Sequence, residues 1–250
     1  MKKDTIVAIA TALSDSGIGI VRVTGDEAIE IVNRIFVNKN GKSCLKDYKS
    51  HTIHYGFIIN CFEDEDDFRK NIVDEVMVAL MKAPNSYTKE DTVEINCHGG
   101  VLLLQKVLEL ILKCGARMAE PGEFTKRAFL NGRIDLTKAE AVMDLIHSQN
   151  EFALKSSVEQ LKGSVSKAIN VLREEIIYEI AFIESALDDP EHISLDGYEE
   201  KLQRKVVSIL ERVQKLIDSA DNGKMMKEGI NTVIVGKPNA GKSSLLNRMV

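Results

Sequence analysis

The residues best suited to do chemistry in this chain lie near its C-terminal end, at residues 236–243, which read G-K-P-N-A-G-K-S. This is the pattern G-x-x-x-x-G-K-[ST], whose glycines let the backbone wrap around phosphate oxygens because no Cβ stands in the way. The N–H groups of a helix that follows point at the anion, and the helix dipole favours its negative charge. Lys242 can add a cation between the β- and γ-phosphates, and Ser243 can supply a hydroxyl to Mg²⁺. The pattern therefore predicts a nucleotide phosphate-binding loop.

The flanking residues support this interpretation. The apolar run at 230–235 predicts a strand, and residues 244–249 favour a helix. The alternative is a glycine-rich turn with a chance lysine, which the four fixed positions and the two flanks disfavour. A complete α/β nucleotide domain has on the order of 150 residues and a parallel sheet covered by helices. Residues 221–250 are therefore expected to be the incomplete start of such a P-loop domain, and the chain alone is expected to lack nucleotide hydrolysis.

Composition sets the remaining limits. The chain has 250 residues, 44% of them hydrophobic, and a formal net charge of −5. Five consecutive acids at 63–67 contribute much of this charge and are typical of a solvated loop. Because phosphate contacts need clustered Lys and Arg, the overall charge argues against nucleic-acid binding through the field of the whole chain. Any contact with RNA is expected to be local or supplied by a partner.

Neither a membrane segment nor a metal motif is predicted. No apolar run reaches the roughly 18 residues that a spanning helix needs, and the first six residues contain two lysines but no long apolar stretch before a cleavage site follows them. We therefore expect no membrane association and a cytoplasmic location. The cysteines at 44, 61, 97 and 114 form no C-x-x-C pair, so free, partly buried thiols are expected rather than a zinc site.

The first 118 residues mix short strands with helices and predict an α+β domain. Two β-branched runs at 5–10 and 18–23 flank a turn at 14–17. Asp26 is a candidate cap for a helix that extends through Phe36. Gly99 and Gly100 are expected to open a second helix. Further strands are predicted at 52–59, 73–81 and 92–97.

Residues 119–220 predict an all-α domain. Apolar residues from 154 to 187 repeat every 11 positions, and three apolar positions in 11 keep one face of a nearly straight helix apolar. A break near Gly163 is possible in this pattern, and Pro190 stops the helix. A second helix is expected to start near Asp196, to pack antiparallel to the first and to end at residues 221–223.

Several motifs together resemble one protein family. The chain is similar to the N-terminal part of the bacterial tRNA modification GTPases called MnmE or TrmE, in which a nucleotide domain, the G domain, is inserted within a helical domain. The resemblance covers residues 4–250. It is carried by D-T-I-V-A at 4–8, G-I-G-I-V-R at 17–22, N-S-Y-T at 85–88, H-G-G at 98–100, P-G-E-F-T at 121–125, R-A-F-L-N-G at 127–132, D-L at 135–136, A-E-A at 139–141 and residues 236–247.

The resemblance implies that residues 1–118 form a domain similar to folate-binding domains, which dimerises and binds a tetrahydrofolate derivative. Carried over by position, Arg22, Glu94 and Arg133 fall where the family contacts the folate. A carboxylate accepts hydrogen bonds from the donor groups of a pterin ring, and a guanidinium holds a carboxylate in a fork. From their spacing alone, three charges on a solvated surface would be the simpler interpretation.

The resemblance also assigns the phosphate loop to GTP. Asn239 falls where related GTPases coordinate a potassium ion, and Ser243 where they bind magnesium. The family then implies potassium-stimulated GTP hydrolysis. This activity acts together with the flavoprotein MnmG in modifying C5 of the wobble uridine of certain tRNAs with a carboxymethylaminomethyl-type group. The GTP-binding residues implied in this way are Asn239, Ala240, Gly241, Lys242, Ser243 and Ser244.

The sequence leaves open the role of His98 and the overall function of the chain. His98 precedes two glycines and is interpreted as the anchor of a strand-to-helix turn rather than as a catalytic group, because no nucleophile or acid stands near it in sequence. The chain can also be interpreted as a stand-alone folate-binding and dimerising module with a vestigial G-domain tail. Besides the modification GTPase and this module, a third interpretation is a ribosome-associated GTPase with a similar phosphate loop. The long folate-like segment disfavours it.

Overall fold

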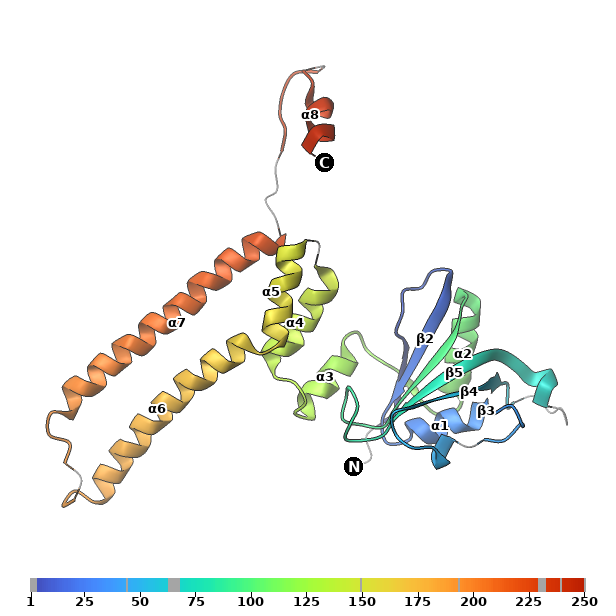
Figure 1. Ribbon diagram of the computed structural model, residues 1–250, viewed down its shortest axis with the longest axis horizontal. Coiled ribbons are helices and arrows are strands. Elements are labelled where there is room, and N and C mark those ends of the chain that lie inside the picture. The colour runs from blue at the N-terminus through green and yellow to red at the C-terminus, as the bar shows by residue number, and fades with distance from the viewer. Residues whose placement is uncertain are drawn as a thin grey trace. The chain divides into compact units, whose positions relative to one another are not determined.

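The structure is a computed structural model of the chain. It describes residues 4–43, 45–62, 68–148, 150–192, 194–228, 233–238 and 240–249. The chain divides into two compact units, Met1–Ala139 and Glu140–Val250, each described here by itself (Figure 1). The first unit extends to residue 139, whereas the change in sequence character placed a boundary at 118.

A seven-stranded sheet forms the centre of the first unit (Figure 1). Its order is β3-β4-β5-β6-β2-β1-β7, and every neighbouring pair is antiparallel except β1 and β7. The predicted strands are thereby confirmed as parts of one sheet. The strands are β1 (Ile6–Ile9), β2 (Ser16–Thr24), β3 (Phe36–Val37), β4 (Thr52–Ile59), β5 (Ile72–Met81), β6 (Thr92–Gly99) and β7 (Arg117–Met118).

Two helices, α1 (Ala28–Ile35) and α2 (Val101–Lys113), cover one face of this sheet. Alternate residues of the central strands, such as Val78 and Ile95, are buried against them in a single core. On β4 and β5 the opposite face exposes Ile53, Tyr55 and Met77. Short 3₁₀ turns lie at Leu45–Asp47 and Phe68–Asn71. The unit is thus α+β, as the sequence predicted, with one sheet face packed and the other partly open.

The limits of α1 differ from the prediction. Asp26 is not its N-cap: the helix starts at Ala28, and the capping position belongs to Glu27, whose side chain makes no capping bond. Phe36 is also outside the helix, because its backbone is extended and pairs with Ile58 of β4. Its fully buried ring shows why the chain turns into the sheet at this point. Tertiary burial therefore overrides the helical periodicity that continued through Phe36.

Helix α3 (Glu123–Leu130) is attached to the first unit by a five-charge network of Asp4, Glu90, Arg117, Glu123 and Arg127. The Arg127 guanidinium donates to Asp4 at 2.7 Å, to Glu90 at 3.1 Å and to Glu123 at 3.1 Å. Arg117 binds Asp4 at 2.7 Å and Glu123 at 2.8 Å. Glu90, Glu123 and Arg127 are buried, so the charges compensate one another in a medium that solvates them poorly.

In the described residues of the second unit, the regular structure is helical. The predicted break at Gly163 is confirmed: this glycine has φ +85° and separates α5 from α6. Asn150 caps α5 by accepting a hydrogen bond from the Ala153 N–H at 2.8 Å. The helices that follow α3 along the chain are α4 (Leu136–His147), α5 (Glu151–Leu161), α6 (Ser164–Asp188), α7 (Tyr198–Glu228) and α8 (Lys242–Met249).

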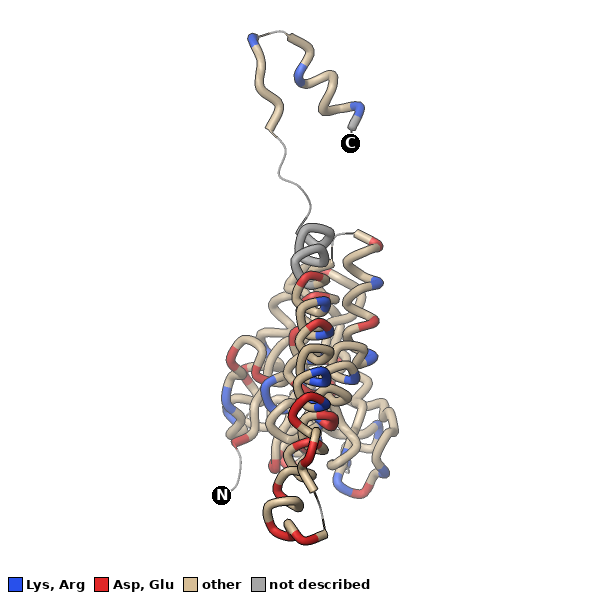
Figure 2. The backbone as a smooth tube through the Cα atoms, turned by 90° about the vertical axis from the view of Figure 1, so that its left-hand side faces the viewer, with Lys and Arg blue, Asp and Glu red and all other residues tan. Residues whose placement is uncertain are grey.

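Helices α6 and α7 lie antiparallel, as predicted (Figure 1). Lys205 pairs with the buried Glu179, while Arg212, further along α7, pairs with the earlier Glu175 at 2.8 Å. Acidic and basic residues are interleaved along this unit (Figure 2). The predicted end of the second helix at 221–223 is wrong, because α7 continues to Glu228. A single glycine costs a helix only about 1 kcal/mol, and a helix of 31 residues accommodates it.

Three cysteines are described, and all are free thiols, as predicted: Cys97 and Cys114 are buried and Cys61 is exposed. Burial raises the pKa of the Cys97 thiol to about 12, and the nearby Asp74 carboxylate adds to this rise. Cys44 lies outside the described residues. The buried pair therefore acts as packing residues and not as reactive thiolates.

Removing Arg127 should destabilise the first unit strongly. We expect Arg127→Ala to lower its free energy of unfolding by about 3–5 kcal/mol, because the buried Glu90 would lose the Arg127 cation and the buried Glu123 would keep only Arg117. Urea unfolding followed through the amide NMR signals of β5 and β6 measures this change. The control is Lys113→Ala, which removes an exposed pair with Glu109 and should cost about 0.5 kcal/mol or less. Equal stabilities of the two variants would contradict the role given to the network.

The network should also make the first unit sensitive to acid. The Arg117 guanidinium, by hydrogen bonding, lowers the pKa of Glu123 from 4.5 to about 2. Because the folded-state pKa is the lower one, this stabilisation is present above pH 4.5 and is lost as the pH falls towards 2. The loss should be on the order of 3 kcal/mol. Unfolding measured across this pH range should depend less steeply on pH in Glu123→Gln, and identical slopes would contradict the assignment.

Candidate functional site

Two of the three predicted folate residues are direct partners in the sheet. Arg22 on β2 stands opposite Glu94 on β6, and the Arg22 Nε donates to the Glu94 Oε1 at 2.7 Å. Arg22 lies between the buried Val21 and Val23, so it points away from the face covered by α1 and α2. The side chains are 30% and 23% exposed, which leaves both accessible from solvent. The structure thus places a cation and a carboxylate together on the more open face.

An aromatic ring accompanies each of the two arginines. The Cζ of Arg22 lies 5.6 Å from the ring centroid of Phe124, and the Cζ of Arg133 lies 4.8 Å from that of Tyr87. Both distances are within the range of a cation–π contact. The Tyr87 hydroxyl is 3.0 Å from the Thr125 Oγ1, next to Phe124 on α3. Arg133 is therefore connected to the Arg22 pair through Tyr87 and α3.

The loop that carries Tyr87 is attached to the end of α3 by side-chain hydrogen bonds. Asn131 donates to the Thr88 carbonyl at 2.6 Å, and the Lys89 ammonium donates to the Gly132 carbonyl at 3.1 Å. Arg127 adds the pair with Glu90. These contacts fix the loop against α3, so the rings and the guanidiniums are positioned by the same small group of contacts.

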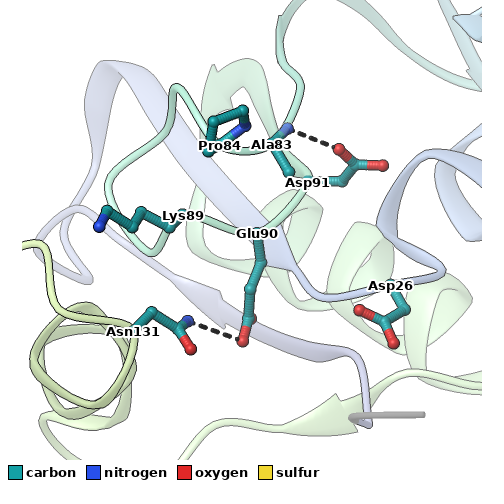
Figure 3. A pocket seen from close by; sticks show the side chains of 7 residues that line it. All are labelled: Asp26, Ala83, Pro84, Lys89, Glu90, Asp91 and Asn131. Atoms are coloured by element: carbon teal, nitrogen blue, oxygen red, sulfur yellow. Dashed lines mark hydrogen bonds between the residues drawn. The ribbon is translucent and has the colours of Figure 1, made fainter.

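A cleft of about 630 Å³ lies beside this loop (Figure 3). Asp91 accepts a hydrogen bond from the Ala83 N–H at 2.8 Å, and Glu90 accepts one from Asn131 at 3.1 Å. Among the described residues no group of three or more His, Cys, Asp and Glu side chains is placed to hold a metal ion. The cleft is lined by Asp26, Ala83, Pro84, Lys89, Glu90, Asp91 and Asn131.

Sequence reasoning missed Tyr87 and Phe124. Both stand inside motifs that carry the family resemblance, at 85–88 and 121–125. Two aromatic residues in motifs otherwise rich in small and polar residues were the available signal. Their partners could not be read from sequence, because each ring meets an arginine from a distant segment.

His98 has an acidic partner that the sequence did not reveal. The Asp74 Oδ1 lies 2.7 Å from the His98 Nδ1, and the Asp74 Oδ2 accepts the His98 backbone N–H at 2.9 Å. Asp74 is buried at the start of β5, and the His98 ring is 70% exposed at the end of β6. The hydrogen bond and charge of Asp74 raise the pKa of His98 above 6.5. The double contact suits the anchoring role expected of His98, and a catalytic role has no further support.

The phosphate loop is described in part. The Lys242 ammonium donates to the Gly236 carbonyl at 2.9 Å and to the Lys237 carbonyl at 2.6 Å, and Gly241 has φ +79°. Helix α8 starts at Lys242, so Ser243 and the following Ser244 lie in its first turn. The cation, the left-handed glycine and the N–H groups of the first helical turn suit a phosphate group.

The remainder of the predicted nucleotide site is not formed or not described. Residues 233–236 have no strand, contrary to the prediction, and Val233 and Val235 are 82% and 88% exposed. A strand needs a neighbour to pair with, and the described residues of this segment supply none. Residues 230–232 and Asn239, with its predicted potassium role, lie outside the described residues.

Comparison with known proteins identifies the family. A family model described as the N-terminus of the GTP-binding protein TrmE matches residues 5–133, and one described as the MnmE helical domain matches residues 136–246. This chain belongs to the MnmE family. The MnmE match confirms the predicted order of an N-terminal domain followed by a helical domain.

Individual MnmE proteins are similar along the whole chain. The tRNA modification GTPase MnmE of Lachnoclostridium phytofermentans is 57% identical over 250 residues, which are 100% of this chain and 53% of that protein. The protein of the same name from Alkaliphilus oremlandii is 51% identical over 99% of this chain and 52% of its own length. The chain thus spans about half the length of these MnmE relatives. In the described part of the chain no helix is both long and apolar enough to cross a membrane.

The His98 contact gives a direct test by NMR. In Asp74→Asn the pKa of His98 should fall back towards 6.5, because the charge and hydrogen bond that stabilise the imidazolium are removed. A pH titration of the imidazole signals measures the change. Asp91→Asn is the control, since Asp91 bonds to the Ala83 N–H and should leave the His98 titration unchanged. The same His98 pKa in all three proteins would refute the pairing.

Proposed function

We propose that the whole protein is a tRNA modification GTPase and that its first unit binds a tetrahydrofolate derivative. The observation that carries the folate proposal is the Arg22–Glu94 pair on the more open sheet face, connected through α3 to Arg133. Glu94 would accept hydrogen bonds from a pterin ring, and the guanidiniums would hold carboxylates in forks. The names of the relatives support the tRNA modification activity.

For the reaction, the proposal follows the family resemblance. The protein would act with the flavoprotein MnmG to install a carboxymethylaminomethyl-type group at C5 of the wobble uridine of certain tRNAs. The bound tetrahydrofolate derivative would supply the one-carbon unit. The part of this chain is to hold that donor with Arg22, Glu94 and Arg133 in a fixed orientation.

GTP would bind at residues 239–244. The first turn of α8 and the Lys242 ammonium would face the phosphates, Ser243 would ligate magnesium, and Asn239 would ligate potassium. The isolated 250-residue chain should lack GTPase activity, because residues 233–249 as described supply a loop and one helix without a sheet.

The proposed partners are a second copy of the chain, tRNA and MnmG. A second copy would dock on the open sheet face of the first unit, where Ile53, Tyr55 and Met77 are exposed, and form the homodimer. The helices of the second unit present interleaved charges (Figure 2), so tRNA contacts would be local or shared with MnmG. A cytoplasmic location without membrane contact completes the proposal.

One observation favours the second candidate, a stand-alone folate-binding and dimerising module. Val233 and Val235 are almost fully exposed beside the phosphate loop, so the G-domain segment of this chain has no packed core of its own among the described residues. This candidate predicts folate binding and self-association without GTP binding.

Calorimetric titration of the 250-residue chain tests these proposals. It should bind 5-formyltetrahydrofolate, and Arg22→Ala should weaken binding about 10-fold or more, as the loss of a charge-assisted hydrogen bond does. Glu94→Gln should also weaken it, while Lys113→Ala should not. A wild-type chain that binds no reduced folate would overturn the folate proposal. Tight binding of Mg-GTP would overturn the stand-alone module.

A further inference from the structure

We propose that Tyr87 and Phe124 are positioning residues of the reduced-folate site and that they give it two chemically different ends. The end at Phe124 takes the pterin ring, and the end at Tyr87 takes the carboxylate tail. This inference rests on the proposed folate function, and it adds an orientation for the ligand and two residues to the site.

The first support is that each ring faces the guanidinium of one predicted folate residue. Phe124 lies under Arg22 at 5.6 Å, and Tyr87 lies under Arg133 at 4.8 Å. An aromatic face holds a guanidinium in a defined plane and still leaves its N–H groups at the edge free to donate. Both rings are half-buried, so they offer a fixed surface. The two arginines are therefore oriented before any ligand arrives, which lowers the entropy lost on binding.

The second support is that both rings belong to one rigid assembly. The Tyr87 hydroxyl contacts Thr125 at 3.0 Å, and Thr125 follows Phe124 directly on α3. The loop of Tyr87 is held to the end of the same helix by Asn131 and Lys89. The separation of the two guanidiniums is thus set by α3 and its contacts and not by flexible side chains.

The third support is the distribution of charge. The Phe124 end contains Glu94, a carboxylate acceptor suited to the N–H groups of a pterin. At the Tyr87 end, Arg133 follows Gly132, whose carbonyl binds the exposed Lys89 ammonium. The Lys89 ammonium thus lies at the peptide bond that joins Gly132 to Arg133, so this end carries two cations from different segments. They complement the two carboxylates that the glutamate tail of a folate carries.

Two ligands and two variants test the orientation. The ligands are 5-formyltetrahydrofolate and 5-formyltetrahydropteroate, which lacks the glutamate. Tyr87→Leu should weaken binding of the folate about 3- to 10-fold, the usual range for losing a cation–π contact, and leave the pteroate within about 2-fold. Phe124→Leu should weaken both ligands by similar factors. Tyr87→Phe keeps the ring and should restore most of the affinity for the folate.

Controls separate this orientation from a general loss of structure. Phe129→Leu removes an exposed ring from the same helix and should change neither affinity. Lys89→Gln is a second, exposed probe of the tail end and should weaken only the folate, so the test does not depend on the folding of Tyr87→Leu. Calorimetry gives the affinities, and thermal unfolding checks that each variant is folded.

The outcomes distinguish the inference from the function on which it rests. A wild-type chain that binds neither ligand would overturn the folate function itself. A wild-type chain that binds the folate, with Tyr87→Leu and Lys89→Gln weakening both ligands equally or neither, would overturn the orientation alone. Selective loss of the folate in those two variants, together with loss of both ligands in Phe124→Leu, would support it.

Discussion

The buried guanidinium of Arg127 is the interaction on which the candidate site depends. It contacts Asp4, Glu90 and Glu123, which come from the start of the chain, the loop after β5 and the first turn of α3. Burial lowers the pKa of Arg127, but its hydrogen bonds to Glu90 and Glu123 outweigh this effect and leave the pKa raised. A buried charge of this kind is tolerated only when each partner is in place. The network therefore enforces one position of α3.

The position of α3 in turn determines the chemistry that the sheet can offer. Without this helix, Arg22 and Glu94 would be an exposed cross-strand pair, which contributes little by itself. With α3 in place, Phe124 lies beside Arg22, and Thr125 holds Tyr87 next to Arg133. A structural charge cluster thus supports a candidate binding surface to which it does not itself belong. Such separation lets the binding groups stay accessible while the supporting charges stay buried.

The sequence predicted the elements better than their ends. The strands followed from β-branched runs, and the break at Gly163 followed from a residue that tolerates φ +85°. The predictions failed where tertiary packing decides: Phe36 leaves α1 because its ring is buried in the sheet, and α7 passes through Gly223 because a long helix tolerates one glycine. Propensity is a weak guide at such positions, since the competing states differ by little more than the packing of one side chain.

The two candidate sites differed in the same way. The phosphate loop could be recognised from sequence because it is local: Lys242 bonds to carbonyls only five and six residues away. The groups at the candidate folate site come from distant segments, since Arg22 and Glu94 are 72 residues apart and the Tyr87–Thr125 contact joins residues 38 apart. No local pattern can encode such pairs, so only the family resemblance pointed to them. Because these segments are distant in sequence, the candidate folate site forms only when the whole first unit is folded. The contacts within the phosphate loop form inside a single short segment. A substitution of any residue in the five-charge network should therefore disturb the candidate folate site and leave the geometry of the phosphate loop unchanged.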